Sequence, residues 1–291
     1  MEIGFIGLGH MGGNMVERLL AAGYTVYGEE RSREHAEHLV HEGLQWRDTP
    51  REVAEAADVL FTSLPDDDAL ESVASGANGI LAGLTAANVW VDVSTVSPRT
   101  SRELAERVRA SGAAMLDAPV SGSVPQVQTG TLTIMVGGDG EAYERVEPIL
   151  RELGSSTHVG ENGQGLVLKL AINISLAVQM LAFAEGLQMA VRAGIDAKLA
   201  ADVMTQSAVG SPMLKARAGL VLDLPEDAWF DIGLMQKDVA LALDTGRELR
   251  VPLPSAAAAD TVLTVARGLG YERRDIAAIF EVLGHMSGGK R

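Results

Sequence analysis

The pattern of hydrophobic and polar positions changes about halfway along the chain. From residue 1 to about 160, short apolar runs alternate with segments of helical periodicity. Short apolar runs bounded by turn residues are typical of buried strands, and strands that alternate with helices predict a parallel sheet with right-handed crossovers. The predicted strands cover residues 3–7, 25–27, 59–64, 89–93 and 132–136, and the predicted helices cover 33–41, 50–57, 99–110 and 141–150.

After about residue 160 the strand patterns end, and alanine-rich helical segments continue to the C-terminus. Segment 164–193 has no proline and is apolar on nearly every face, which predicts a long, mostly buried helix that stops at Gly194. Further helices are predicted over 197–206, 234–249, 255–269 and 273–282. We therefore expect a doubly wound α/β domain over residues 1–162, followed by an all-helical domain over 163–291 that begins with the long helix.

Charge and composition narrow the class of partner. The chain of 291 residues carries 24 Lys and Arg against 39 Asp and Glu, a formal charge of −15, and it has no cysteine. Such a charge disfavours nucleic acid and anionic membranes, although a few local cations still allow a small anionic substrate. The N-terminus lacks a secretory signal pattern, and the most apolar stretch is interrupted by polar side chains such as Lys169 and Glu185. We expect a cytoplasmic protein that binds neither nucleic acid nor membrane.

A glycine-rich motif follows the first predicted strand directly. Gly7 permits the tight turn, Gly9 lets the backbone approach a pyrophosphate, and Gly12 lets the following helix pack closely on the strand. The free N–H groups at the start of that helix would bind the diphosphate. The motif predicts a Rossmann-type dinucleotide site formed by Gly7, Leu8, Gly9, His10, Met11 and Gly12.

The second predicted strand ends in a segment that bears on the choice of cofactor. Glu30 lies where an acidic residue would bind the adenosine ribose hydroxyls, which favours NAD, whereas Arg31 and Arg33 would suit the 2′-phosphate of NADP and leave that cofactor open. Leu64, Pro65 and Thr95 follow later strands, where strand ends open onto the ligand crevice, and are expected to contact the cofactor, Thr95 at the nicotinamide ribose.

Lys169 and Asn173 are the candidate catalytic residues. Reduction of a carbonyl requires an acid that protonates the developing alkoxide, and the reverse reaction requires its conjugate base. The two residues are four positions apart on the long predicted helix, so they project from one face. Burial among apolar residues would lower the pKa of Lys169 toward the working pH. Alternatively, the lysine stem packs on the helix and the ammonium reaches water.

Two further elements would bind the substrate. Ser121, Gly122 and Ser123 form a short polar turn whose N–H groups and hydroxyls suit a carboxylate, although a plain turn gives the same pattern. Lys237, from the helical domain, would neutralise that carboxylate or contact the cofactor, although exposed lysines on helices are common.

Several of these motifs, in this order, resemble the β-hydroxyacid dehydrogenase family, which includes 3-hydroxyisobutyrate dehydrogenases and tartronate semialdehyde reductases. The resemblance covers nearly the whole chain, and its motifs begin at Gly7, Asp92, Asp117, Gly163 and Lys237. It implies NAD(P)-dependent interconversion of a short 3-hydroxy carboxylate and its semialdehyde, with Lys169 as general acid and base. It also implies a homodimer or homotetramer. Two positions depart from the family: Ser123 often corresponds to a glycine, and Glu30 replaces the asparagine usual in NADP-using members.

Three alternative functions remain at this level. The chain could reduce tartronate semialdehyde, succinic semialdehyde or glyoxylate, because one methylene or hydroxyl changes preference by only about 1–3 kcal/mol. It could be an imine reductase, although the resemblance implies that such enzymes usually carry another residue at Lys169. It could also be a nucleotide-binding sensor without catalysis.

Overall fold

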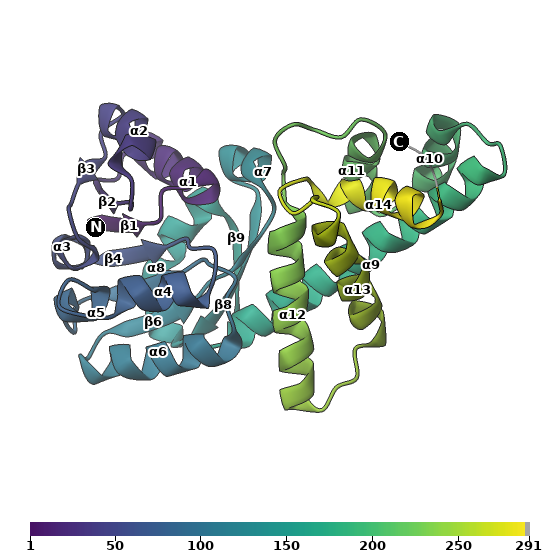
Figure 1. The fold of residues 1–291 in the computed structure, drawn as a ribbon. Helices are drawn as coiled ribbons and strands as arrows, with labels where there is room; N and C mark the ends of the chain where they lie inside the picture. The colour runs from purple at the N-terminus through teal and green to yellow at the C-terminus, as the bar shows by residue number, and fades with distance from the viewer. Residues whose placement is uncertain (289–291) are drawn as a thin grey trace. The chain divides into compact units, whose positions relative to one another are not determined.

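The computed structural model, which describes residues 1–288, consists of two compact units (Figure 1). The first unit is Met1–Lys169, and the second begins at Leu170. The division therefore falls within helix α9 (Gln164–Arg192), whose first residues belong to the first unit.

The first unit alternates strands and helices. Its strands are β1 (Ile3–Ile6), β2 (Val26–Glu29), β3 (Gln45–Trp46), β4 (Val59–Thr62), β5 (Val89–Asp92), β6 (Ala114–Asp117), β7 (Val120–Ser121), β8 (Leu132–Gly138) and β9 (Gly154–Gly160). Its helices are α1 (His10–Ala21), η1 (Arg33–Ala36), α2 (Glu37–His41), α3 (Pro50–Ala56), α4 (Asp67–Ala74), α5 (Ile80–Gly83), α6 (Pro98–Ala110), α7 (Val124–Thr129) and α8 (Gly140–Leu153).

The strands form one sheet in the order β3-β2-β1-β4-β5-β6-β8-β7, with β9 beside β8. The six strands from β3 to β6 are parallel and have the order typical of a dinucleotide-binding domain. The prediction of a parallel sheet is confirmed for these six strands, whereas at one edge β8 runs antiparallel to both β6 and β7. After β6 the chain passes through β7 and the short α7 and then enters β8. A parallel strand would need a crossover helix that returns the chain to the opposite end of the sheet, and no such helix lies between β6 and β8.

Helices cover both faces of this sheet, so the doubly wound α/β fold is confirmed. On one face, Phe5 of β1 packs with Met15 of α1 and Val146 of α8. On the other face, Ile6 belongs to a cluster with Leu104 of α6. Neighbouring residues of one strand thus enter opposite cores, which is why these strands appear in the sequence as continuous apolar runs.

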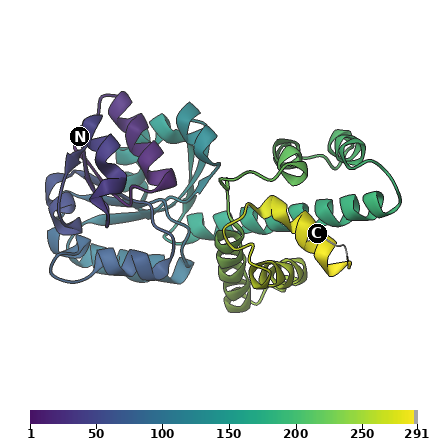
Figure 2. The same cartoon turned by 45° about the horizontal axis from the view of Figure 1, so that its top comes forward.

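The named elements of the second unit's described residues are all helices, as expected. Phe183 and Leu187 of α9 form its core with Met235, Leu263 and Ile279 from later helices, and Figure 2 shows those helices, in green and yellow, beside the teal α9. The later helices are α10 (Ala197–Gln206), α11 (Pro212–Leu222), α12 (Ile232–Leu249), α13 (Pro254–Gly268), η2 (Ile276–Ala278) and α14 (Ile279–Met286).

Helix α9 is unusually apolar. Among the helices of residues 1–288 it is the one long and apolar enough to cross a membrane by length and composition, with a mean hydropathy of 1.9 over its most apolar window. Only 39% of that window is buried within the described structure. The apolar surface of α9 is therefore covered only in part by this chain.

Several short or polar elements of the structure were not predicted from the sequence. Strand β9 contains two glycines and two serines, so no apolar run marks it. Helix α11 begins with Pro212 after the N-cap Ser211, and this proline looks like a break in the sequence although proline suits the first turn of a helix. The helix predicted over 33–41 is divided into η1 and α2. The two-residue β3 and β7 and the short α4, α5 and α7 were also not predicted as elements.

Candidate active site

The fingerprint loop lies between β1 and α1. Gly7 has a φ of +89°, and a Cβ there would collide with the Ser63 carbonyl oxygen. A Cβ at Gly12 would collide with the Gly7 carbonyl oxygen and lie 2.9 Å from the Phe5 ring. Both glycines are therefore required by the fold itself.

Gly9 differs from both. A Cβ there would meet nothing within 4 Å in the described chain, so packing does not demand a glycine. Gly9 is the N-cap of α1, and no side chain caps this helix or places a carboxylate in its first turn. The helix start thus presents N–H groups and a partial positive charge toward open space, which fits a dinucleotide diphosphate.

Glu30 connects the end of β2 to this loop. Its Oε2 accepts a hydrogen bond from the Leu8 N–H at 2.8 Å, and its Oε1 accepts one from the Arg31 N–H at 3.0 Å. Burial, and then repulsion from Glu30, raise the pKa of the preceding Glu29 to about 7. The Arg31 side chain is exposed, whereas the Arg33 guanidinium lies 5.3 Å from the centre of the Trp46 ring.

A buried polar network joins the loops that follow β4 and β5. The Ser94 hydroxyl accepts a hydrogen bond from the Leu64 N–H at 2.9 Å and donates to Asp92 Oδ1 at 2.6 Å. The same carboxylate oxygen accepts the Thr62 hydroxyl at 2.7 Å. The predicted cofactor contacts Leu64 and Pro65, and Thr95 next to Ser94, therefore follow neighbouring strands whose ends are fixed by one buried aspartate.

The segment predicted as a polar turn is a strand end followed by a helix cap. Ser121 ends β7, Gly122 has a φ of +134°, and Ser123 is the N-cap of α7. The Gln126 side-chain oxygen accepts the Ser123 N–H at 2.9 Å. One of the N–H groups expected to bind a carboxylate is therefore satisfied within the chain.

Lys169 lies on α9, three residues after Leu166, and is half-buried. The start of the helix is attached to the sheet through Asp117, whose Oδ1 accepts the Gly163 N–H at 2.6 Å and whose Oδ2 accepts the Leu166 N–H at 3.0 Å. Burial raises the pKa of Asp117 to about 6, although these two backbone hydrogen bonds act to lower it.

Asn173, one turn beyond Lys169 on α9, is 1% exposed and donates from its side-chain nitrogen to Asp238 Oδ2 at 2.5 Å. The Lys237 ammonium lies 3.1 Å from Asp238 Oδ1. Asp238 thus connects two predicted site residues, Asn173 and Lys237, within the second unit.

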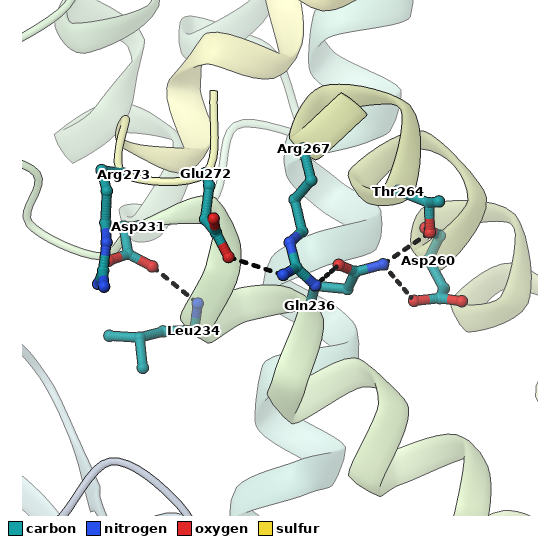
Figure 3. Close-up of polar contacts among 8 residues, drawn as sticks. All are labelled: Asp231, Leu234, Gln236, Asp260, Thr264, Arg267, Glu272 and Arg273. Carbon is teal, nitrogen blue, oxygen red and sulfur yellow. Dashed lines mark hydrogen bonds and ion pairs between the residues drawn. The ribbon is translucent and has the colours of Figure 1, made fainter. Parts of the chain in front are cut away.

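Figure 3 shows a second network that holds the N-terminal half of α12 against α13. The Arg267 guanidinium donates to Gln236 Oε1 at 2.9 Å and to Glu272 Oε1 at 2.7 Å. The amide nitrogen of Gln236 donates to the Thr264 hydroxyl at 2.6 Å and to Asp260 Oδ1 at 3.3 Å. Gln236 immediately precedes Lys237 and Asp238, so this network restrains the turn that carries them.

None of three buried aspartates was among the candidate site residues predicted from the sequence. Asp92, Asp117 and Asp238 are at most 2% exposed. Asp92 and Asp117 are the last residues of the apolar strands β5 and β6. An acidic residue at the end of a buried strand could have been recognised in the sequence, because a buried carboxylate needs hydrogen-bond donors at close range.

An α/β domain with an open glycine-rich helix start, followed by a helical unit in which the buried Asn173 and Asp238 pair beside the partly exposed Lys237, defines a dehydrogenase of the nicotinamide-dinucleotide class. A family model described as "NAD binding domain of 6-phosphogluconate dehydrogenase" matches residues 2–160. A second, "NAD-binding of NADP-dependent 3-hydroxyisobutyrate dehydrogenase", matches residues 163–283.

Known proteins resemble the chain over nearly its full length. It is 35% identical to 2-(hydroxymethyl)glutarate dehydrogenase of Eubacterium barkeri over 290 residues, which cover 99% of this chain and 96% of the relative. The structure is similar to 3-hydroxyisobutyrate dehydrogenase from Salmonella typhimurium, with a TM-score of 0.88, 29% identity and coverage of 97% of this chain and 99% of that chain. It is equally similar, with a TM-score of 0.88, 31% identity and the same coverage, to the protein Psf3 solved with NADP⁺ and 2-OPP.

The chain belongs to the 3-hydroxyisobutyrate dehydrogenase family and is an NAD(P)-dependent oxidoreductase acting on CH–OH groups. The family resemblance found in the sequence is confirmed.

Proposed function

We propose that the enzyme interconverts a short 3-hydroxy carboxylate similar to 3-hydroxyisobutyrate and its semialdehyde. The observation that carries this proposal is a half-buried lysine, Lys169, one helical turn before a buried asparagine, Asn173, that is itself held by Asp238. A bound nicotinamide dinucleotide supplies or accepts the hydride.

In this proposal, Lys169 exchanges the proton with the substrate oxygen. Its ammonium donates to the carbonyl oxygen during reduction, and the neutral amine accepts the hydroxyl proton during oxidation. Asn173 orients the reacting group, and the Asp238 contact fixes its amide. Ser121, Gly122 and Ser123 are proposed to bind the substrate carboxylate. Lys237, whose ammonium pairs with Asp238, is proposed as a cationic ligand of substrate or cofactor.

For the cofactor we propose a preference for NAD over NADP. A carboxylate at Glu30 would repel a 2′-phosphate, and its two backbone hydrogen bonds hold it at the end of β2. Arg31 is exposed at the same strand end, so the preference is expected to be modest.

The decisive experiment compares wild-type enzyme with Lys169→Ala. Loss of a positioned general acid is expected to lower kcat by about 10²–10⁴-fold. Binding of NADH, followed by its fluorescence, is expected to remain close to that of the wild type. Near-normal turnover of Lys169→Ala would contradict the proposal, and binding without turnover of any substrate by the wild type would favour a sensor.

Steady-state kinetics with NAD and NADP distinguish the remaining substrates. The panel is 3-hydroxyisobutyrate, 3-hydroxypropionate, glycerate, tartronate semialdehyde, succinic semialdehyde and glyoxylate. A cyclic imine is included to test the alternative function of imine reduction. The highest kcat/KM is expected for a branched or unbranched 3-hydroxy acid of three or four carbons. A higher value for the imine would contradict the assignment.

We also propose that the enzyme is a cytoplasmic homodimer or homotetramer in which a second copy covers the exposed apolar side chains of α9 and α10. Met189 is 73% exposed, and Leu199 and Val203 are 57% and 60% exposed. This surface accounts for the apolar but partly uncovered α9, and the buried Asn173 in that helix suits a protein core better than a lipid environment.

A further inference from the structure

We propose that Asp117 is a positioning residue, whose carboxylate fixes the first turn of α9 at the end of β6 and thereby sets the position of Lys169. This inference rests on the proposed role of Lys169 and adds to it the group that holds the catalytic helix. Asp117, Lys169 and the contacts between them all lie within the first unit.

The contacts are two backbone hydrogen bonds into one helix start. Asp117 Oδ1 accepts the Gly163 N–H at 2.6 Å, and Oδ2 accepts the Leu166 N–H at 3.0 Å. The aspartate is fully buried, so water does not compete for these groups. Each oxygen of the carboxylate has its own donor, which fixes the helix start in rotation as well as in distance.

Two glycines lie directly against the carboxylate of Asp117. A Cβ at Gly137 would lie 2.7 Å from Asp117 Oδ1, and a Cβ at Gly165 would lie 2.8 Å from Oδ2. Real Cβ atoms do not approach other atoms so closely, so these positions must remain glycine while the aspartate stays in place. A longer side chain at residue 117 would have no room either.

A second hydrogen bond connects the same two elements. The side-chain nitrogen of Asn162, just before α9, donates to the Met115 carbonyl oxygen of β6 at 2.8 Å. Asp117 ends β6, and two residues later the chain enters β7, which ends at Ser121, the first residue of the predicted substrate anchor. The short segment from β6 to β7 therefore carries the proposed carboxylate site and also holds the start of the helix that bears the proposed acid.

Helix geometry transmits this restraint to the lysine. Lys169 is three residues after Leu166 and lies on the same face, about one turn from the hydrogen-bonded N–H. A shift or rotation of the first turn therefore moves the ammonium relative to Ser121. Catalysis is sensitive to such shifts, because a misplacement of about 1 Å can cost about 10²-fold in rate.

The test is Asp117→Asn, which keeps shape and volume but offers an NH₂ group to one of the two backbone donors. We expect kcat to fall at least tenfold, while the affinity for NADH changes less than threefold because the fingerprint loop is untouched. The amides of Gly163 and Leu166 should exchange hydrogen for deuterium faster. Asp117→Glu should not restore kcat.

The matched control is Asp139→Asn. Asp139 caps α8 by accepting the Ala142 N–H at 2.8 Å, also within the first unit, but forms no hydrogen bond or ion pair with α9 among the described residues. It should lower stability and leave kcat and the exchange at the start of α9 unchanged. A loss of kcat in Asp117→Asn no larger than in this control would overturn the inference.

Two further results keep the test decisive. If Asp117→Asn does not fold, Asp117→Ser keeps one acceptor in a smaller side chain and should also lower kcat at least tenfold, with unchanged kcat overturning the inference. Normal turnover of Lys169→Ala would remove the proposed function. An inactive Lys169→Ala together with a fully active Asp117→Asn would remove only the inference about Asp117.

Discussion

Individual glycines of the fingerprint loop serve two different purposes. Gly7 and Gly12 make room for the chain itself, because a Cβ at Gly7 would collide with the Ser63 carbonyl oxygen after β4 and one at Gly12 with the Gly7 carbonyl oxygen. A Cβ added at Gly9 would meet no described atom within 4 Å, so a glycine at this position leaves space for a bound ligand and not for the chain itself. The sequence motif alone does not separate these roles, since all three residues are glycine.

Glu29 should make stability depend on pH. Burial raises its pKa from 4.5 to about 7, so the folded state holds this proton more strongly than the unfolded state does. Its contribution to the free energy of unfolding is therefore fully present at low pH and is lost as pH rises toward 7 and beyond. Because the carboxyl is partly exposed, we expect the change to be about 1 kcal/mol or less.

Urea unfolding of wild type and Glu29→Gln at pH 5 and pH 8 measures this effect. The variant should gain stability relative to wild type on going from pH 5 to pH 8. The exposed Glu103→Gln serves as the control and should show no such gain. An equal difference between Glu29→Gln and wild type at both pH values would contradict the prediction.

Among the elements, α9 and α12 carry the proposed chemistry, and side chains from other elements hold both. Asp117 at the end of β6 holds the start of α9, and Arg267 of α13 holds α12 through Gln236. The contacts at Gly163 and Leu166 lie six and three residues before Lys169, and Gln236 immediately precedes Lys237. These contacts fix the turns of helix next to the predicted site residues, and thereby position the side chains that those turns carry.

Arg267→Ala should destabilise the second unit by about 1 kcal/mol, because an exposed ion pair with Glu272 and a hydrogen bond to Gln236 are lost together. Arg267→Lys should recover only part of this loss, since an ammonium does not reproduce the fork that reaches both partners. Thermal unfolding measures the change.

The control for this prediction is Lys198→Ala. It removes the exposed ion pair between Lys198 and Asp202 on α10 and should alter stability by less than about 0.5 kcal/mol. Equal effects of Arg267→Ala and Lys198→Ala would show that the α12–α13 network has no special importance.

At the scale of the whole molecule, the exposed apolar side chains of α9 and α10 predict self-association. Light scattering should give a mass that is a multiple of 30.6 kDa. Val203→Glu places a charge on this surface and should shift the mass toward the monomer, whereas Ser72→Glu on α4 should not. A wild-type particle of 30.6 kDa would contradict the prediction.

The sequence by itself determined the fold class and the identity of many candidate site residues. Buried strands on both faces leave continuous apolar runs, the fingerprint loop requires glycine at fixed spacing, and the i, i+4 relation of Lys169 and Asn173 follows from helix geometry. These are local patterns, set by neighbours a few positions away.

Only the tertiary structure decided which buried groups pair. The Asp117 contacts span 46 and 49 residues and the Asn173–Asp238 contact spans 65, so no local periodicity could reveal them. The antiparallel direction of β8 likewise depends on where the chain re-enters the sheet. The physical reason is that a buried carboxylate must find donors in three dimensions, and its partners are chosen by the packing of distant segments.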